Sequence, residues 1–255
     1  MKQNDVTNVF GYSISNGGIT EAVTLASQAL LGRSRPLFVA CANPHSLIVA
    51  SRDAEFRNAL QSADILLPDG YGIVLAARLL AQPLTTRVSG NDFFVNFSRK
   101  IANKHRLSYF FLGSSNHVLD LISVRLAREY PSIKLCGLYS PPFKDSFIEE
   151  ENLRMIEAIR VAKPDVLWVG MTAPKQEKWI YQNRDRLNVP LISAIGAVFD
   201  FYAGTTKQAP LFLQKAGLEW LVRSVKEPGR LGKRNLFSIP VFLVWIIKER
   251  LKRMR

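Results

Sequence analysis

Residues 64 to 72, Asp-Ile-Leu-Leu-Pro-Asp-Gly-Tyr-Gly, are the stretch from which the fold of this chain is inferred. The apolar run Ile65–Leu67 predicts a short buried strand, and Pro68 is expected to end its ladder because proline has no N–H to donate. Asp69 follows directly, beside Gly70, which can adopt backbone angles that other residues avoid. Ligands of open parallel sheets bind at the carboxyl ends of the strands. Asp69 is therefore a candidate general base, with an ordinary Asp-Gly turn as the alternative.

The same pattern, an apolar run followed by a polar or glycine-containing turn, recurs along the chain. Such runs lie at 37–41, 108–112, 133–138, 165–169 and 190–195, and segments with helical periodicity separate them. Strands that are apolar throughout and alternate with helices are typical of a parallel sheet covered on both faces. The sequence therefore predicts an α/β fold with a Rossmann-like, doubly wound, mostly parallel sheet. One helix is expected from about residue 44 to residue 62, with Asn43 as its cap and Pro44 in its first turn.

The character of the chain changes after Phe201. We expect residues 1–205 to form an α/β catalytic domain and residues 206–255 to form a helical, basic C-terminal appendage. The net charge is +13, and from residue 215 onwards 11 Lys and Arg residues stand against 3 Asp and Glu residues. A basic tail of this kind predicts an anionic partner, which is a nucleic acid, a phospholipid surface or a phosphorylated substrate.

The appendage contains the apolar segment 241–247, followed by a basic end. This segment is too short to span a bilayer. It is either a helix docked on the core or a helix that lies in a membrane interface with its basic end on anionic head groups, and Trp245 favours the interface. Cys41 and Cys136 are interpreted as reduced, buried thiols, and the N-terminus has no apolar signal-peptide core. We therefore expect a cytoplasmic protein, peripheral at the inner face of the cell membrane.

Glycines follow four of the predicted strands, at positions 70, 113, 170 and 196. In a parallel sheet these four turns meet on one edge, where backbone N–H groups at helix starts can bind phosphate oxygens. Asn43, Gln176, Glu177 and Asp200 are polar residues expected on the same edge, with Gln176 and Glu177 in a first helical turn. The sequence thus predicts a nucleotide or phosphosugar site that includes Gly113 and Gly170.

Other common sites are not supported. Gly70 and Gly72 have the first spacing of a dinucleotide fingerprint, but Leu75 occupies the place of its third glycine, and no P-loop motif occurs. The three histidines are scattered without metal-ligand spacing. Neither a resident cofactor nor a metal ion is expected, so arginines and lysines of the tail are candidates to stabilise a leaving diphosphate.

Several longer strings carry a family resemblance. They are N-P-H-S-L at 43–47, L-P-D-G at 67–70, R-V-S-G-N-D at 87–92, V-G-M-T-A-P-K-Q-E-K-W at 169–179, G-A-V-F-D-F-Y-A-G at 196–204 and G-L-E-W-L-V-R-S-V-K-E-P-G-R at 217–230. In this order they resemble the WecG/TagA/CpsF family of bacterial glycosyltransferases, and the resemblance covers most of the chain.

The resemblance implies an inverting, metal-independent transferase of surface polysaccharide synthesis. Such an enzyme moves a hexose or N-acetylhexosamine-type sugar from a UDP-sugar to a polyprenyl-diphosphate-linked saccharide at the anionic inner membrane surface, and it tends to self-associate. Asp69 matches the proposed base of the family. The positions that match substrate-binding residues are Asn43 and Arg87 in the sugar and acceptor pocket, Gln176 and Asp200 near the nucleotide, and Arg223 and Arg230 over the diphosphate.

Two positions depart from the family pattern. Cys41 stands where the family usually has threonine, and a thiol is a poor hydrogen-bond donor to a sugar. Gln208 stands where the family has arginine, with Lys207 before it. Both departures leave the donor sugar open between glucose, N-acetylmannosamine and its uronate.

Two other functional classes are alternatives to the transferase. An NAD-dependent nucleotide-sugar oxidoreductase or epimerase would need a bound dinucleotide. A basic nucleic-acid-binding protein would need a basic stripe interleaved with aromatic residues, which the predicted sheet region lacks, so no nucleic acid partner is expected.

Overall fold

The computed structural model describes residues 5–32, 35–102, 107–215, 218–226, 229 and 232–253, without the side chains of 211, 215, 223, 226 and 233–236. Six strands form one sheet in the order β4-β3-β8-β7-β5-β6, and every neighbouring pair is parallel. They are β3 (Leu37–Ala42), β4 (Ile65–Pro68), β5 (Ser108–Gly113), β6 (Lys134–Tyr139), β7 (Val166–Gly170) and β8 (Leu191–Ala194). The predicted α/β, Rossmann-like parallel sheet is confirmed.

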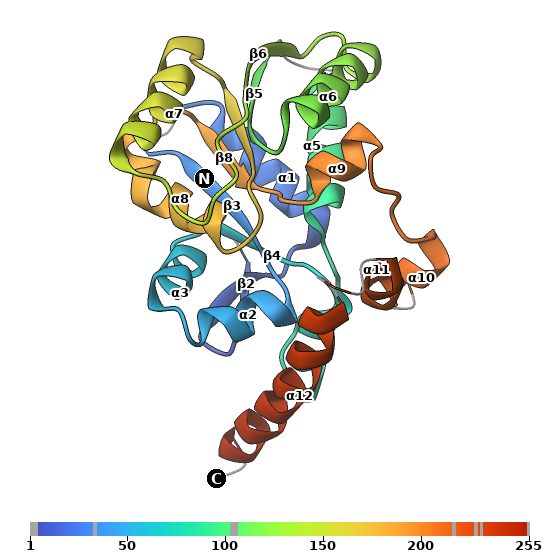
Figure 1. Cartoon of the computed structure of the whole chain (residues 1–255). Coiled ribbons are helices and arrows are strands. Elements are labelled where there is room, and N and C mark those ends of the chain that lie inside the picture. Colours follow the sequence, from blue (N-terminus) through green and yellow to red (C-terminus); the bar gives the residue numbers. More distant parts are fainter. Residues whose placement is uncertain are drawn as a thin grey trace.

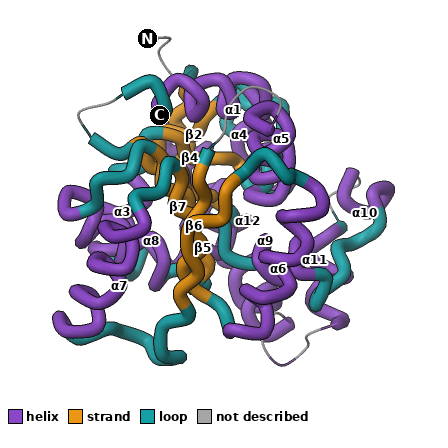
Figure 2. Tube along the Cα trace, turned by 90° about the horizontal axis from the view of Figure 1, so that it is seen from above, coloured by secondary structure: helices purple, strands orange, loops and turns teal. Residues whose placement is uncertain are grey.

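Helices cover both faces of the sheet, so that the molecule has three layers (Figures 1 and 2). One face carries α1 (Gly18–Ala29), α5 (Gly90–Ala102), α6 (Asn116–Glu129) and α9 (Val198–Ala203). The other carries α2 (Pro44–Ala50), α3 (Ala54–Gln61), α7 (Glu149–Ala162) and α8 (Lys175–Asn183), which continues into the short 3-10 helix η1 (Arg184–Arg186). The strands are apolar throughout because both of their faces are buried.

An antiparallel hairpin, β1 (Val6–Val9) and β2 (Tyr12–Ser15), precedes α1. The region after β3 differs from expectation. The helix expected over 44–62 is two helices, α2 and α3. The break follows from Asp53, whose side chain accepts the N–H of Phe56 at 3.0 Å and so caps a new helix.

The C-terminal region contains α10 (Leu211–Lys215), α11 (Glu219–Lys226) and the long helix α12 (Lys233–Arg253). One side of α12 docks against α2 and α4 (Tyr71–Leu79), and this side buries Ser238, Phe242 and Ile246. Phe10 of the hairpin stacks on Trp245 with ring centroids 4.3 Å apart. Docking on the core is thus confirmed for this side of the helix, and Trp245 belongs to that contact.

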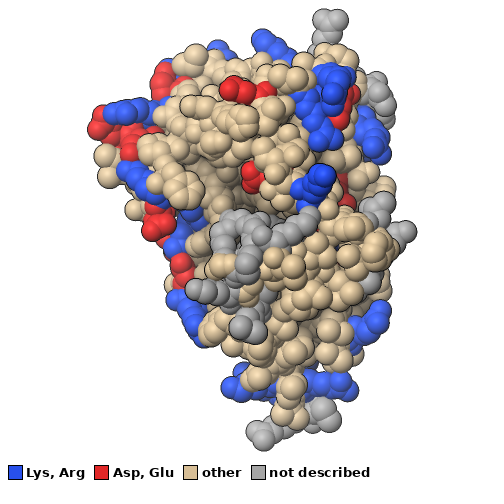
Figure 3. All heavy atoms as spheres, turned by 45° about the vertical axis from the view of Figure 1, so that its right-hand side comes forward, with Lys and Arg blue, Asp and Glu red and all other residues tan. Residues whose placement is uncertain are grey.

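The opposite side of α12 exposes apolar residues: Leu243, Val244, Ile247 and Leu251. The part of the surface that α12 forms, at the bottom of Figure 3, is largely uncharged, with Lys and Arg side chains at its far end. None of the described helices combines the length and hydropathy needed to cross a bilayer.

Candidate active site

Asp69 is positioned by the end of β4, which is an edge strand of the sheet. Pro68 pairs with Ala42 of β3, and the N–H of Asp69 donates to the carbonyl of Ala42 at 2.8 Å. Pro68 is the last paired residue of β4, so the predicted end of the ladder is confirmed, but the missing N–H is not its cause. The N–H that proline lacks would point to the outer edge, where the carbonyl of Pro68 accepts from Val88 at 3.0 Å. Gly70 then turns the chain with φ 93°, a conformation that favours glycine.

Asn43 lies beside Asp69, at the end of β3, and caps α2 as predicted. Its Oδ1 accepts the N–H of Ser46 at 2.9 Å, and the Oγ of Ser46 accepts the N–H of Asn43 at 2.8 Å. This reciprocal cap holds the amide in place and uses its oxygen. The Nδ2 group is consequently the part of Asn43 that can donate to a ligand.

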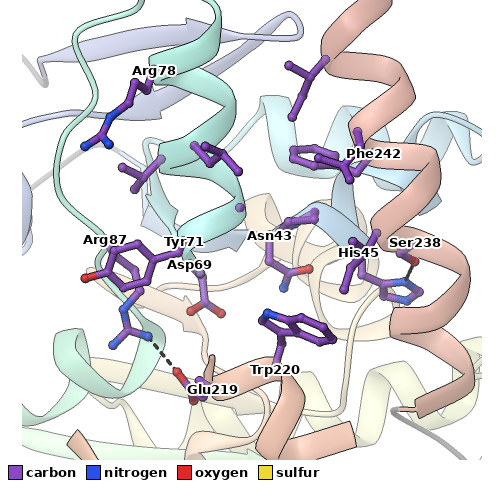
Figure 4. A pocket seen from close by; sticks show the side chains of 18 of the residues that line it. Asn43, His45, Asp69, Tyr71, Arg78, Arg87, Glu219, Trp220, Ser238 and Phe242 are labelled. Atoms are coloured by element: carbon purple, nitrogen blue, oxygen red, sulfur yellow. Dashed lines mark hydrogen bonds and ion pairs between the residues drawn. The ribbon is translucent and has the colours of Figure 1, made fainter. Parts of the chain in front are cut away.

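Arg87 comes from the loop before α5, and its side chain is only 12% exposed. Its guanidinium forms an ion pair with Glu219 at 2.9 Å and a second one with Asp92 at 3.3 Å, and it also donates to Gln214. Glu219 and Gln214 belong to α11 and α10. The appendage is thus joined to the loop that carries Arg87, as Figure 4 shows for Glu219.

Two cavities flank this group of residues. The polar cavity, of about 630 Å³, follows the carboxyl ends of the strands and the starts of α6, α8 and α9. The apolar cavity, of about 500 Å³, runs between α4 and α12 (Figure 4). The apolar cavity is lined along its length by Val74, Leu75, Ile239, Phe242, Leu243 and Ile246.

Asn43 and Asp69 line both cavities, and so do Gln214 and Glu219 of the appendage. In Figure 4 the carboxylate of Asp69 and the amide of Asn43 point into the space above the indole of Trp220. A carboxylate at the junction of two cavities can act on a group from either of them. This arrangement suits transfer between two substrates that approach from opposite sides.

Gly170, Gln176 and Asp200 line the polar cavity, as their placement on one sheet edge predicted, and Cys41 lines it as well. The Cys41 thiol is partly buried, and burial together with the negative charges of Asp69, Glu177 and Asp92 raises its pKa well above the usual range. Cys41 therefore stays a neutral thiol at physiological pH and has little nucleophilic character.

Gly113 has a packing role. It does not line either cavity, whereas Ser114 and Ser115, which follow it, line the polar one. Gly113 has φ 127°, and a Cβ there would lie 2.3 Å from the carbonyl oxygen of Gly170. The two adjacent strand ends approach so closely that only glycine fits.

The structure describes the predicted tail arginines only in part. Arg223 lies in α11, but its side chain is outside the described part, and Arg230 lies outside the described residues altogether. Sequence reasoning missed Glu219 and Trp220, which line the apolar cavity, although both stand in the G-L-E-W string. Among the described residues no group of three or more His, Cys, Asp or Glu side chains has the geometry of a metal site.

Known proteins resemble this chain over nearly its whole length. Residues 7–255 match the model of the glycosyl transferase WecG/TagA/CpsF family.

The chain belongs to this family of glycosyltransferases.

This membership favours the transferase over the oxidoreductase and the nucleic-acid-binding protein. Relatives of this family member include an N-acetylglucosaminyldiphosphoundecaprenol N-acetyl-beta-D-mannosaminyltransferase of Bacillus spizizenii, 29% identical over 91% of this chain and 86% of its own. A protein with the same name from Staphylococcus aureus (strain MW2) is 30% identical over 85% of this chain and 82% of its own. Another, from Bacillus subtilis (strain 168), is 27% identical over 92% of this chain and 88% of its own.

Proposed function

We propose that this glycosyltransferase moves an N-acetylhexosamine-type sugar from a UDP-sugar to a polyprenyl-diphosphate-linked saccharide, with inversion, in the synthesis of a cell-envelope polymer. The observation that carries the proposal is that Asp69 and Asn43 line both cavities. One cavity suits a polar, anionic donor and the other suits a lipid-linked acceptor. The names of the relatives support an acceptor of this class.

The polar cavity has the features of a donor site. The starts of α6 and α8 face it, through Ser114, Ser115, Thr172 and Ala173. Helix N-termini present free N–H groups and a positive dipole, which favour phosphate oxygens. We therefore assign the diphosphate of the UDP-sugar to this cavity.

The apolar cavity suits the first isoprene units of the acceptor. Its walls are aliphatic and aromatic side chains of α4 and α12, and its inner end reaches Asp69 and Arg87. A lipid chain in this cavity would bring the diphosphate and the saccharide to the polar end. Arg87 would then meet anionic oxygens of the acceptor, for which a guanidinium is well suited.

The exposed side of α12 supports a membrane location for the reaction. It combines Val244, Ile247 and Leu251 with basic side chains at the helix end, which suits an interface with anionic lipids. The helix thus has one side for the core and one side for the bilayer, next to the cavity assigned to the lipid. The inner face of the cell membrane, where UDP-sugars are available, is the expected site of action.

The proposed step is one displacement. The carboxylate of Asp69 takes the proton of an acceptor hydroxyl while that oxygen attacks the anomeric carbon of the donor. The bond from this carbon to the diphosphate oxygen breaks, and UDP leaves with the electron pair. Backbone N–H groups at the strand ends, with Arg223 and Arg230 of the tail, would stabilise the charge on UDP. Because these groups would balance the charge on UDP without a metal ion, we expect the reaction to continue when EDTA removes divalent metal ions.

The test supplies the full-length chain with a short-chain polyprenyl-diphosphate N-acetylglucosamine. UDP-N-acetylmannosamine, UDP-N-acetylglucosamine and UDP-glucose are offered in turn, with UDP release and product mass as the readouts. The proposal expects release of UDP that depends on the acceptor, together with a disaccharide product of β configuration made from an α-linked donor. A product of retained configuration would refute the single displacement. Failure to transfer from any UDP-sugar to this acceptor would refute the substrate assignment.

A further inference from the structure

Glu177 is a buried acid to which the proposed displacement gives no role. It lies in the first turn of α8, is 2% exposed and lines the polar cavity. Its Oε1 accepts a hydrogen bond from Nε2 of Gln176 at 2.8 Å. Its Oε2 is buried and has no hydrogen-bond partner among the described residues. A buried oxygen without a partner is costly, so it indicates either a strained site or a missing ligand.

The hydrogen bonds around Glu177 decide which of its atoms is available. The Oε1 of Gln176 accepts the backbone N–H of Met171 at 3.2 Å, so the amide nitrogen of Gln176 must face Glu177. This leaves Oε2 of Glu177 as the unused atom of the pair. The pair stands over Gly196, where a Cβ would lie 3.4 Å from the Gln176 amide. It is therefore held at the ends of β7 and β8, on the cavity side of the sheet.

The surroundings of Glu177 favour its neutral form. The titratable group coupled to Glu177 is the Cys41 thiol on β3. The carboxylates of Asp69, Glu177 and Asp92 all raise the pKa of this thiol. Lys175, on the same helix, also lines the cavity, but its Nζ donates to the carbonyl of Lys144. Burial raises the pKa of Glu177 to about 7. The residue is thus largely protonated in mildly acidic conditions and ionises above neutrality.

We propose that Glu177 binds the sugar of the donor by donating a hydrogen bond from a protonated Oε2 to one of its oxygens. This inference rests on the proposed function, which assigns the donor to the polar cavity. A protonated acid can donate where a carboxylate can only accept. Hydroxyl and acetamido oxygens of an N-acetylhexosamine are suitable acceptors. A neutral group also avoids adding a negative charge beside the anionic diphosphate.

The experiment measures binding of UDP-N-acetylmannosamine and of UDP to the full-length chain by calorimetry between pH 6 and pH 8.5. For the wild type we expect the affinity for the sugar nucleotide to fall about 30-fold, because the protonated fraction of a group with a pKa of about 7 falls by that factor. The affinity for UDP should change far less. Glu177→Gln keeps a neutral donor at this position, so its affinity should stay within about threefold of the wild-type value at pH 6 and should not follow the wild-type curve. Glu157→Gln, at an exposed position on α7, is the matched control and should reproduce the wild type.

Other results would overturn the inference. A wild-type affinity that is flat or rises with pH would exclude a protonated donor, and this measurement needs no variant to fold. A loss of more than tenfold in Glu177→Gln at pH 6, with an unchanged melting temperature, would mean that the ionised carboxylate accepts a hydrogen bond. Parallel curves for UDP and for the sugar nucleotide would assign the effect to the nucleotide part. If the wild type bound neither ligand at any pH, the donor assignment of the proposed function would fail as well.

Discussion

Nη1 of Arg87 lies 2.9 Å from Oε2 of Glu219, a residue 132 positions later in the chain. This ion pair joins the loop beside Asp69 to the first turn of α11. Glu219 is 23% exposed, so solvent screens the pair only in part. The geometry of the candidate active site therefore depends on how the C-terminal region is seated.

Glu219→Gln is expected to lower the free energy of unfolding by about 1–2 kcal/mol, because it leaves a largely buried guanidinium with Asp92 as its remaining acidic partner. Urea denaturation measures the change. Glu129→Gln, which breaks the more exposed pair with Arg125, is the matched control and should cost less than about 0.5 kcal/mol. Equal costs for both variants would contradict a special role for the Arg87 pair.

Asp69→Asn should lower the turnover number by about 10²–10⁴-fold, the usual contribution of a positioned general base. Binding of the UDP-sugar should stay within a few-fold, because the amide keeps the shape of the side chain. Steady-state kinetics and calorimetry separate the two quantities. The exposed Asp120→Asn on α6 serves as the control for loss of one carboxylate. Full turnover in Asp69→Asn would remove the residue from its proposed role.

The raised pKa of Glu177 also predicts how stability depends on pH. Its pKa is about 7 in the folded chain against an ordinary value of 4.5, so the folded state binds the proton more tightly than the unfolded state does. The contribution of Glu177 to stability is therefore fully present below pH 4.5 and is lost as the pH rises to about 7.

Denaturation of the wild type and of Glu177→Gln at several pH values tests this sign. The variant should gain stability relative to the wild type by about 3 kcal/mol between pH 4.5 and pH 8, since its amide does not ionise. A stability difference that is constant over this range would show that Glu177 is not a buried acid with a raised pKa.

The exposed side of α12 predicts a separable membrane function. Val244→Ser with Ile247→Ser should weaken sedimentation with phosphatidylglycerol-containing vesicles by tenfold or more, since about 1.5–3 kcal/mol is expected for each buried aliphatic side chain. Both residues are at least half exposed, so the melting temperature should hardly change. Val124→Ser, on the exposed side of α6, is the control. Undiminished vesicle binding would place the membrane contact elsewhere.

The local pattern was sufficient for the part of the site that lies on strand ends. Asp69 follows an apolar run, Asn43 precedes Pro44, and Gly170 ends another run, so each position could be assigned from its neighbours in sequence. Parallel strands then bring these positions to one edge, whatever their order in the sheet. Gln176 and Asp200 were found in the same way.

Glu177 shows where this reasoning was incomplete. It stands in the charged string P-K-Q-E-K-W, and its place in a first helical turn on the functional edge was expected, but its burial was not. The residue is nevertheless buried, because α8 places Glu177 and Ile180, three positions apart, on its inner side. That spacing was the available signal, and the charge of the segment concealed it.

The sequence by itself determined most of the order of strands and helices, the parallel sheet and the position of Asp69 at a strand end, because these depend on periodicity and turn chemistry within a few residues. Only the tertiary structure decided that Glu219 pairs with Arg87, that Phe10 stacks on Trp245 and that two cavities meet at Asp69. These contacts join segments more than a hundred residues apart. They depend on the shape and charge of surfaces that exist only once the sheet has formed, and no local pattern encodes which surfaces will meet.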